Sequence, residues 1–234
     1  METGKTGKYF KYAIGEIILV VIGILIALQI NNWNEGRKNS DLLINYKNNL
    51  IEDLKKDSMS INASILEIKN DSMAINNFKK RISNTTKALD TILKIARYEY
   101  DYYIVVHDNY NNDTNQVLNS TGDIGLFNSE IINDLNVLHN LQESALNAQT
   151  LTLSNFSNNM NNYVKKYPFS FHFNLIANGT NAANIIWEQI SLRDHATEFN
   201  ALVMSKGDSY RLSLRYLPFV LEKTNALLAK LRKL

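Results

Sequence analysis

The stretch YAIGEIILVVIGILIALQINNWNE, from Tyr12 to Glu35, decides the fold because it is apolar enough and long enough to cross a membrane. The 21 residue steps from Tyr12 to Trp33 span about 32 Å as a helix, close to the roughly 30 Å of hydrocarbon in a bilayer. Only Glu16 and Gln29 interrupt the run, and each lies near one end. Four interpretations compete: a cleaved secretion signal, a buried core helix, a pilin-like stalk and a permanent membrane anchor.

The residues that flank the run favour the anchor. A cleaved signal has a shorter apolar region followed by a small-x-small site, which residues 28–33 (LQINNW) do not offer. A type IV pilin would need a glycine five residues before Glu16, where Lys11 stands, so a pilin-like assembly subunit is kept only as an alternative. Aromatic residues lie at both ends of the run, as in a spanning helix; they are Tyr9, Phe10, Tyr12 and Trp33.

The orientation in the membrane is predicted from the lengths of the segments on the two sides of the apolar run, more than from their charges. The basic residues are nearly balanced, with Lys5, Lys8 and Lys11 before the run and Arg37, Lys38 and Lys47 after it. A flank of eleven residues is short, and a long domain can translocate whatever its charge. We therefore expect residues 1–11 in the cytoplasm, a transmembrane helix over 12–33 in the cytoplasmic membrane, and an extramembrane domain over 34–234 in the periplasm.

One stripe of the anchor invites a partner. At 100° per residue, Glu16, Gly23 and Ala27 fall within about 40° of one another on the helix surface. Gly23 and Ala27 form a small-xxx-small pair that would let another helix approach closely, and Glu16 would prefer a partner to lipid. Alternatively, Glu16 lies one turn from the interface and extends toward the headgroups.

The chain after the anchor has a seven-residue apolar repeat, which predicts a long helix packed along a coiled-coil-like seam. The repeat consists of Leu54, Ile61, Ile68, Ile75, Ile82, Leu89 and Ala96. The sequence SNTT at residues 83–86 offers the first turn, with a second helix starting near Lys87, although the seam could also continue unbroken.

Residues 97–113 carry β-branched and aromatic residues that could form a strand, but in so helical a chain we expect a helix end and a polar loop. Three further helices are predicted: from Asn128 toward Val164, from Asn181 to Met204 with a stop at Gly207, and from Ser209 to the C-terminal LLAKLRKL. The predicted fold class is therefore all-α: a single transmembrane helix that continues into an elongated bundle of four or five helices.

Two segments carry a resemblance to a known family. Residues 11–38, KYAIGEIILVVIGILIALQINNWNEGRK, resemble the shared N-terminus of an uncharacterised family of single-pass membrane proteins from Gram-negative bacteria. The stretch LNSTGDIGLFNSEIINDLNVLH, from Leu118 to His139, is similar to that family's second recurring segment. The resemblance implies the single-pass topology and a helical extramembrane domain, and it supplies no activity.

Charge is segregated along the chain. The net charge is +2, and residues 98–164 contain eight acids but no lysine or arginine, whereas the C-terminal third is basic. No part of this pattern resembles a nucleic-acid footprint. The acids could face the basic helices within the bundle; otherwise an exposed acidic surface would suit a basic partner or a cation, and its residues would be Glu99, Asp101, Asp108 and Asp113.

The sequence offers no catalytic, metal or cofactor constellation. There is no cysteine, and the four histidines have no i,i+3 or i,i+4 partner histidine; they are His107, His139, His172 and His195. The Gly4-Lys5-Thr6 run lacks the earlier glycine and the strand of a phosphate loop. The residues from Asn109 to Ser120 lack the glycine and the glutamate of a calcium loop. We therefore expect no enzyme activity, no metal and no cofactor.

Three functions remain open. The first is a membrane-anchored interaction or scaffold protein whose partners are the lipid bilayer and either another membrane protein or itself. The second is a ligand-sensing periplasmic domain, which would have only eleven cytoplasmic residues to signal through. The third, an enzyme, is disfavoured by the missing constellation.

Overall fold

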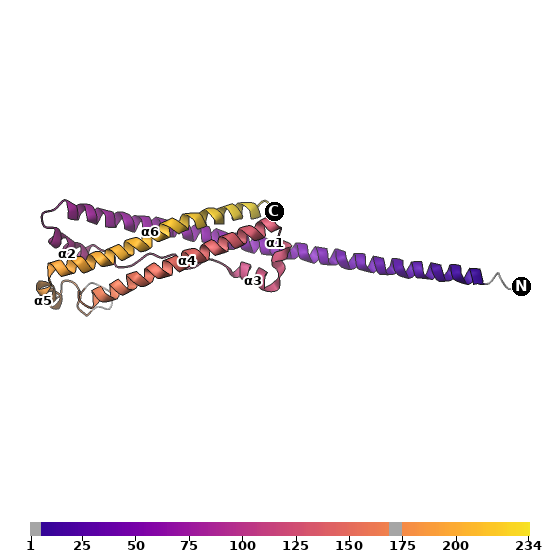
Figure 1. The fold of residues 1–234 in the computed structure, drawn as a ribbon, viewed down its shortest axis with the longest axis horizontal. Coiled ribbons are helices and arrows are strands. Elements are labelled where there is room, and N and C mark those ends of the chain that lie inside the picture. The colour runs from indigo at the N-terminus through magenta and orange to yellow at the C-terminus, as the bar shows by residue number, and fades with distance from the viewer. Residues whose placement is uncertain (1–5, 169–174) are drawn as a thin grey trace.

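The computed structural model describes residues 6–168 and 175–234, with the backbone alone for residues 6–12. Every regular element in these ranges is helical, so the all-α prediction is confirmed. The elements are α1 (Thr6–Ser83), α2 (Ala88–Tyr98), α3 (Asp113–Thr121), the short 3₁₀ helix η1 (Asp123–Leu126), α4 (Ser129–Val164), α5 (Asn181–Gln189) and α6 (Leu192–Leu231). The molecule is elongated, with α1 reaching far beyond the bundle toward the N-terminus (Figure 1).

α1 is a single helix of 78 residues, about 117 Å long at 1.5 Å per residue. From Ala13 to Leu42 nearly all of its side chains are exposed, and none of its most apolar 18-residue window is buried. Among the described helices it is the one long and apolar enough to cross a membrane. The bundle begins near Tyr46, whose hydroxyl donates a hydrogen bond to Asp123 Oδ2 at 2.8 Å. The C-terminus of α6 and the helix α3 lie at the base of the bundle, the end nearest the exposed apolar part of α1, and α2 and α5 lie at the far end (Figure 1).

The seven-residue repeat forms the core face of α1. Leu54, Ile61, Ile68 and Ile75 are each at most 6% exposed. The seam does not continue as one helix, because α1 ends at Ser83 and residues 84–87 form the expected turn. Leu89, which keeps the sequence spacing beyond that turn, is 41% exposed.

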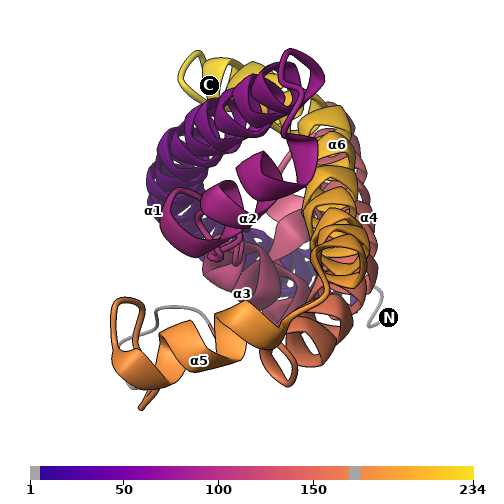
Figure 2. The same ribbon diagram turned by 90° about the vertical axis from the view of Figure 1, so that its left-hand side faces the viewer.

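The bundle is built on α1, α4 and α6. α6 packs against both of the other long helices, and Figure 2 shows α4 and α6 side by side with α1 across from them. Residues 99–112, which we call the extended segment, have neither helix nor strand and make hydrogen bonds to all three long helices. The extended segment thus fills the place between α1 and α4 that a fourth long helix would take.

The predicted break at Gly207 is wrong. α5 ends at Gln189, and α6 runs without interruption through Gly207 and Pro218. The new helix starts earlier because the Ser191 hydroxyl accepts a hydrogen bond from Asp194 N at 3.3 Å, which caps its N-terminus. A glycine inside a helix costs only about 1 kcal/mol. Burial of the α6 residues on either side of Gly207 outweighs that cost.

Candidate functional site: an extended segment inside the bundle

The extended segment 99–112 runs through the core although it has no regular structure. Tyr100, Tyr102, His107 and Tyr110 are all at most 9% exposed. Backbone N–H and C=O groups in such a place need partners, because an unpaired buried polar group is costly. In this protein the partners are side chains of the surrounding helices.

α1 presents three polar residues along one stripe, and they reach the segment either directly or through residues of α6. Asp57, Ser64 and Asp71 follow one another at intervals of seven residues, or about 10.5 Å along the helix. Asp57 Oδ1 accepts hydrogen bonds from Asn111 N at 2.8 Å and from Asn111 Nδ2 at 2.6 Å. Ser64 Oγ lies 3.2 Å from His107 Nδ1. Asp57 and Ser64 therefore contact the segment directly, at two successive levels of the bundle.

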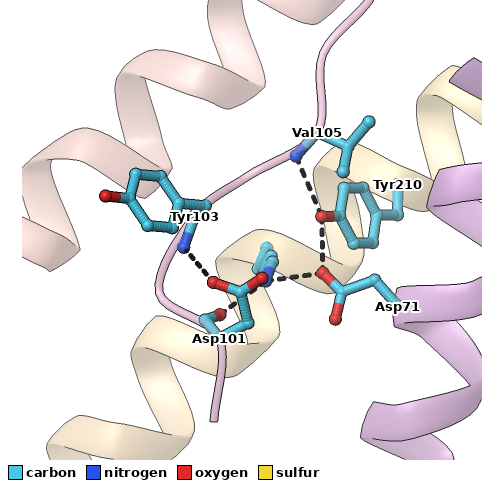
Figure 3. A network of polar contacts seen from close by, with 6 residues as sticks. Asp71, Asp101, Tyr103, Val105 and Tyr210 are labelled. Carbon is cyan, nitrogen blue, oxygen red and sulfur yellow. Dashed lines mark hydrogen bonds and ion pairs between the residues drawn. The ribbon is translucent and has the colours of Figure 1, made fainter.

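At the third level, Asp71 belongs to a buried ionic network (Figure 3). Lys206 Nζ, on α6, lies 2.6 Å from Asp71 Oδ2 and donates a hydrogen bond to the Asp101 carbonyl at 2.7 Å. Tyr210 donates its hydroxyl hydrogen to Asp71 Oδ2 at 2.7 Å and accepts from Val105 N at 3.0 Å. Burial raises the pKa of the Tyr210 phenol, which keeps it protonated as a donor. The network joins α1 and α6 through the extended segment.

α4 holds the middle of the segment with one carboxamide. Gln149 Oε1 accepts from His107 N at 3.0 Å, and Gln149 Nε2 donates to the His107 carbonyl at 2.8 Å. Both backbone groups of one residue are thereby paired, much as a neighbouring β-strand would pair them. Burial lowers the pKa of the His107 imidazole and raises the pKa of the Asp57 carboxyl.

A second buried group lies at the far end of the bundle. His195 on α6 is fully buried among the rings of Tyr167, Trp187 and Phe199. Its Nε2 atom lies 2.8 Å from the hydroxyl of Tyr163 on α4. Burial lowers the pKa of His195 to about 4, so the imidazole is neutral at physiological pH. This cluster joins α5 to the ends of α4 and α6.

The residues expected to pair with another helix lie on the free part of α1. Glu16, Gly23 and Ala27 are exposed, and a Cβ added to Gly23 would meet no atom within 4 Å. Trp33, at the end of the span, is 70% exposed. The other residues of the aromatic belt belong to the α1 backbone, but their side chains lie outside the described part of the chain; they are Tyr9, Phe10 and Tyr12. Helix pairing and interface anchoring remain predictions.

The four acids of the predicted acidic surface are all exposed, but they differ in their partners. Glu99 forms a two-fold hydrogen-bonded ion pair with Arg81 of α1, and this pairing lowers its pKa. Asp101 accepts from Tyr103 N at 2.9 Å, and neither it nor Asp108 nor Asp113 makes an ion pair with a described residue.

Part of the acidic middle does face the basic C-terminal third. Lys230 on α6 lies 2.6 Å from Glu130 and 2.5 Å from Asp134, both on α4. The two arrangements considered for the acids thus occur together, at different places along the bundle.

Within the described residues, no group of three or more histidine, aspartate or glutamate side chains is placed to hold a metal ion. His172 lies outside the described residues. Asp57, Gln149, Lys206 and Tyr210 bind the backbone of the extended segment and fix it in place.

Residues 16–96 match a family of unknown function (DUF6090). The matched part begins in the exposed apolar part of α1, includes the rest of α1 and ends in α2. No curated protein and no solved structure matches the chain. The second resembling segment, Leu118–His139, lies outside the matched residues, and the comparison assigns no activity.

Proposed function

We propose that this chain is a membrane-anchored helical interaction protein, which holds a rigid bundle at a fixed distance from the bilayer and pairs with another helix inside it. One observation carries the proposal: the same uninterrupted helix, α1, contains the exposed apolar stretch and one side of the bundle core. A change of tilt or rotation in the anchor is therefore transmitted directly to the bundle, without a flexible linker.

The distance between membrane and bundle follows from the helix rise. From Trp33 to Tyr46 there are 13 residues, or about 20 Å of helix. Nearly all of these side chains are exposed. The bundle thus stands clear of the headgroups, where a partner can reach its surface. We place residues 1–11 in the cytoplasm, the span over 12–33 in the inner membrane and the domain over 34–234 in the periplasm.

Pairing within the membrane would use the stripe of Glu16, Gly23 and Ala27. The partner we favour is a second copy of the chain, because two identical stripes bring small residues against small residues and place the two glutamates together, where a protonated carboxyl of one can donate a hydrogen bond to the other. An ionisable side chain inside a membrane prefers such a partner to lipid. The proposal includes no catalysis, no cofactor and no nucleic acid.

The topology can be tested with single cysteines, because the chain has none of its own. Cysteine is introduced at Asn140, which is exposed on α4, or at Lys5 in the N-terminal flank. In cells with a permeabilised outer membrane, an impermeant maleimide should label Asn140→Cys and leave Lys5→Cys unlabelled until the inner membrane is broken. The reverse pattern would overturn the orientation, and recovery of the protein in the soluble fraction would overturn the anchor.

Helix pairing is tested by disulfide crosslinking in native membranes. Ala27→Cys lies on the stripe, and Leu25→Cys lies about 180° away from Glu16 around the helix. Ala27→Cys should crosslink, and Leu25→Cys should not. Adding Gly23→Leu should abolish the crosslink, whereas the matched control Gly15→Leu, off the stripe, should leave it. Equal crosslinking at both positions would remove the pairing surface from the proposal.

A further inference from the structure

One small cavity lies beside the middle of the extended segment. Its walls come from the segment, from α4 and from α6, and they include His107, Tyr110, Gln149 and Ser213. Its volume is about 10 Å³ by the measure in which a single water molecule needs roughly 10–15 Å³. The cavity is too small for any organic ligand.

Three polar atoms of these lining residues are buried and have no hydrogen-bond partner among the described residues: His107 Nε2, the Tyr110 hydroxyl and Ser213 Oγ. The three side chains that carry them are 2%, 8% and 6% exposed. A cavity with apolar walls alone stays dry, whereas a cavity that offers a water molecule two to four polar partners holds an ordered water. Three unpaired polar groups around a cavity of this size therefore identify a hydration site.

We propose that this cavity binds one water molecule, which is hydrogen-bonded to His107 Nε2, to the Tyr110 hydroxyl and to Ser213 Oγ. The hydrogen-bond donors and acceptors around the water can be matched for either imidazole tautomer of His107. Water offers two donors and two acceptors, and each hydroxyl both donates and accepts. No carboxylate lines the cavity, so its walls favour a neutral molecule over a metal cation.

The water completes the attachment of the extended segment. At the level of His107, Ser64 of α1 reaches the imidazole Nδ1 atom and Gln149 of α4 holds the backbone. The water adds the missing connection to α6 through Ser213. One residue of the segment is then joined to all three long helices.

The test counts long-lived internal waters in the full chain, in detergent micelles, by magnetic relaxation dispersion of the solvent. Ser213→Val fills the cavity and removes one polar partner, so the count should fall by one. The matched control is Ser205→Ala, also buried on α6, whose hydroxyl already donates to the Leu202 carbonyl and does not line the cavity. An unchanged count in Ser213→Val would overturn the site.

A second measurement uses the unsubstituted chain and so does not depend on how a variant folds. With ¹⁵N-labelled histidine, the Nε2 resonance of His107 should show the shift of a hydrogen-bonded nitrogen and a cross-peak to water. A shift typical of an imidazole nitrogen without a hydrogen bond would contradict the proposal, as would a partner from the protein itself.

Discussion

The Nζ atom of Lys206 lies 2.6 Å from Oδ2 of Asp71, and the lysine side chain is completely buried. Its remaining donor capacity is directed at the Asp101 carbonyl and at the faces of the Tyr100 and Tyr210 rings. A charge so enclosed is tolerated only while its counterion stays in place. The ion pair joins α6 directly to α1. Because the same ammonium also donates to the Asp101 carbonyl, the packing of the two helices is linked to the position of the extended segment.

Asp71→Ala should lower the free energy of unfolding by roughly 3–5 kcal/mol, because it leaves the Lys206 ammonium buried without a counterion. Chemical unfolding of the full chain in micelles, followed by circular dichroism, measures the loss. The double variant Asp71→Leu with Lys206→Met should lose less than Asp71→Ala alone, since it removes both charges.

The control for this pair is an exposed one. Glu52 and Lys55 lie 3.8 Å apart with both side chains more than half exposed, so Glu52→Ala should change the free energy of unfolding by less than about 0.5 kcal/mol. If Asp71→Ala lowers the free energy of unfolding no more than Glu52→Ala does, the buried pair does not hold α6 against α1.

Gln149→Leu should release the middle of the extended segment. The substitution leaves the N–H and C=O groups of His107 without partners, and each unpaired buried group costs about 1–3 kcal/mol, so we expect a loss of roughly 2–6 kcal/mol. Hydrogen exchange should rise most around residues 105–109. Gln116→Leu, on the exposed face of α3, is the control and should leave that protection unchanged.

Stability should fall between about pH 6.5 and pH 4 because of His195. Its pKa is lowered to about 4 in the fold from 6.5, so the unfolded chain binds a proton that the folded chain rejects. The contribution is fully present above pH 6.5 and is lost as the pH falls toward 4, amounting to about 3 kcal/mol for a shift of this size.

The pH effect is isolated by comparison with His195→Gln, which stays neutral and can still accept a hydrogen bond from Tyr163. Burial lowers the pKa of His107 and raises the pKa of Asp57, so these two groups act in opposite directions in both proteins. The free energy of unfolding of the unsubstituted protein should therefore fall relative to that of His195→Gln as the pH falls from 6.5 to 4. Parallel curves would show that His195 does not titrate on unfolding.

The long apolar helix, the core face of α1 and the start of α4 could be predicted because each depends on local spacing. Ile61 and Ile68 sit on a seven-residue repeat that any seam would bury. Asn128 caps α4 through its own side chain, which accepts from Ile131 N at 2.9 Å. Gly207 misled the prediction because tertiary burial overrides a weak local preference. The helix α3 was not predicted, since seven of its nine residues are polar and the other two, Val117 and Leu118, are adjacent and show no helical period.

The attachment of the extended segment was missed for a different reason. Its partners come from helices that are distant in sequence, such as Gln149 and Lys206, so no spacing within the segment reveals them. One signal was available in the sequence of α1. Three polar residues, Asp57, Ser64 and Asp71, recur at intervals of seven along a stripe that has an apolar residue at each end. Polar residues repeated on an otherwise buried stripe indicate a polar chain passing through the core.

Among the glycines at the base of the bundle, Gly122 should be the one whose substitution lowers the free energy of unfolding most. It ends α3 with a φ of 80°, a conformation that costs an L-residue roughly 1–2 kcal/mol. Gly122→Ala should lower the free energy of unfolding by about that amount, although an added Cβ would meet no atom within 4 Å. Gly125→Ala is the matched control, because Gly125 lies nearby with equal space and no positive φ, and it should change stability by less than about 0.5 kcal/mol. Equal effects of the two substitutions would mean that the turn before Asp123, and with it the Tyr46 contact at the base of the bundle, does not depend on the left-handed backbone.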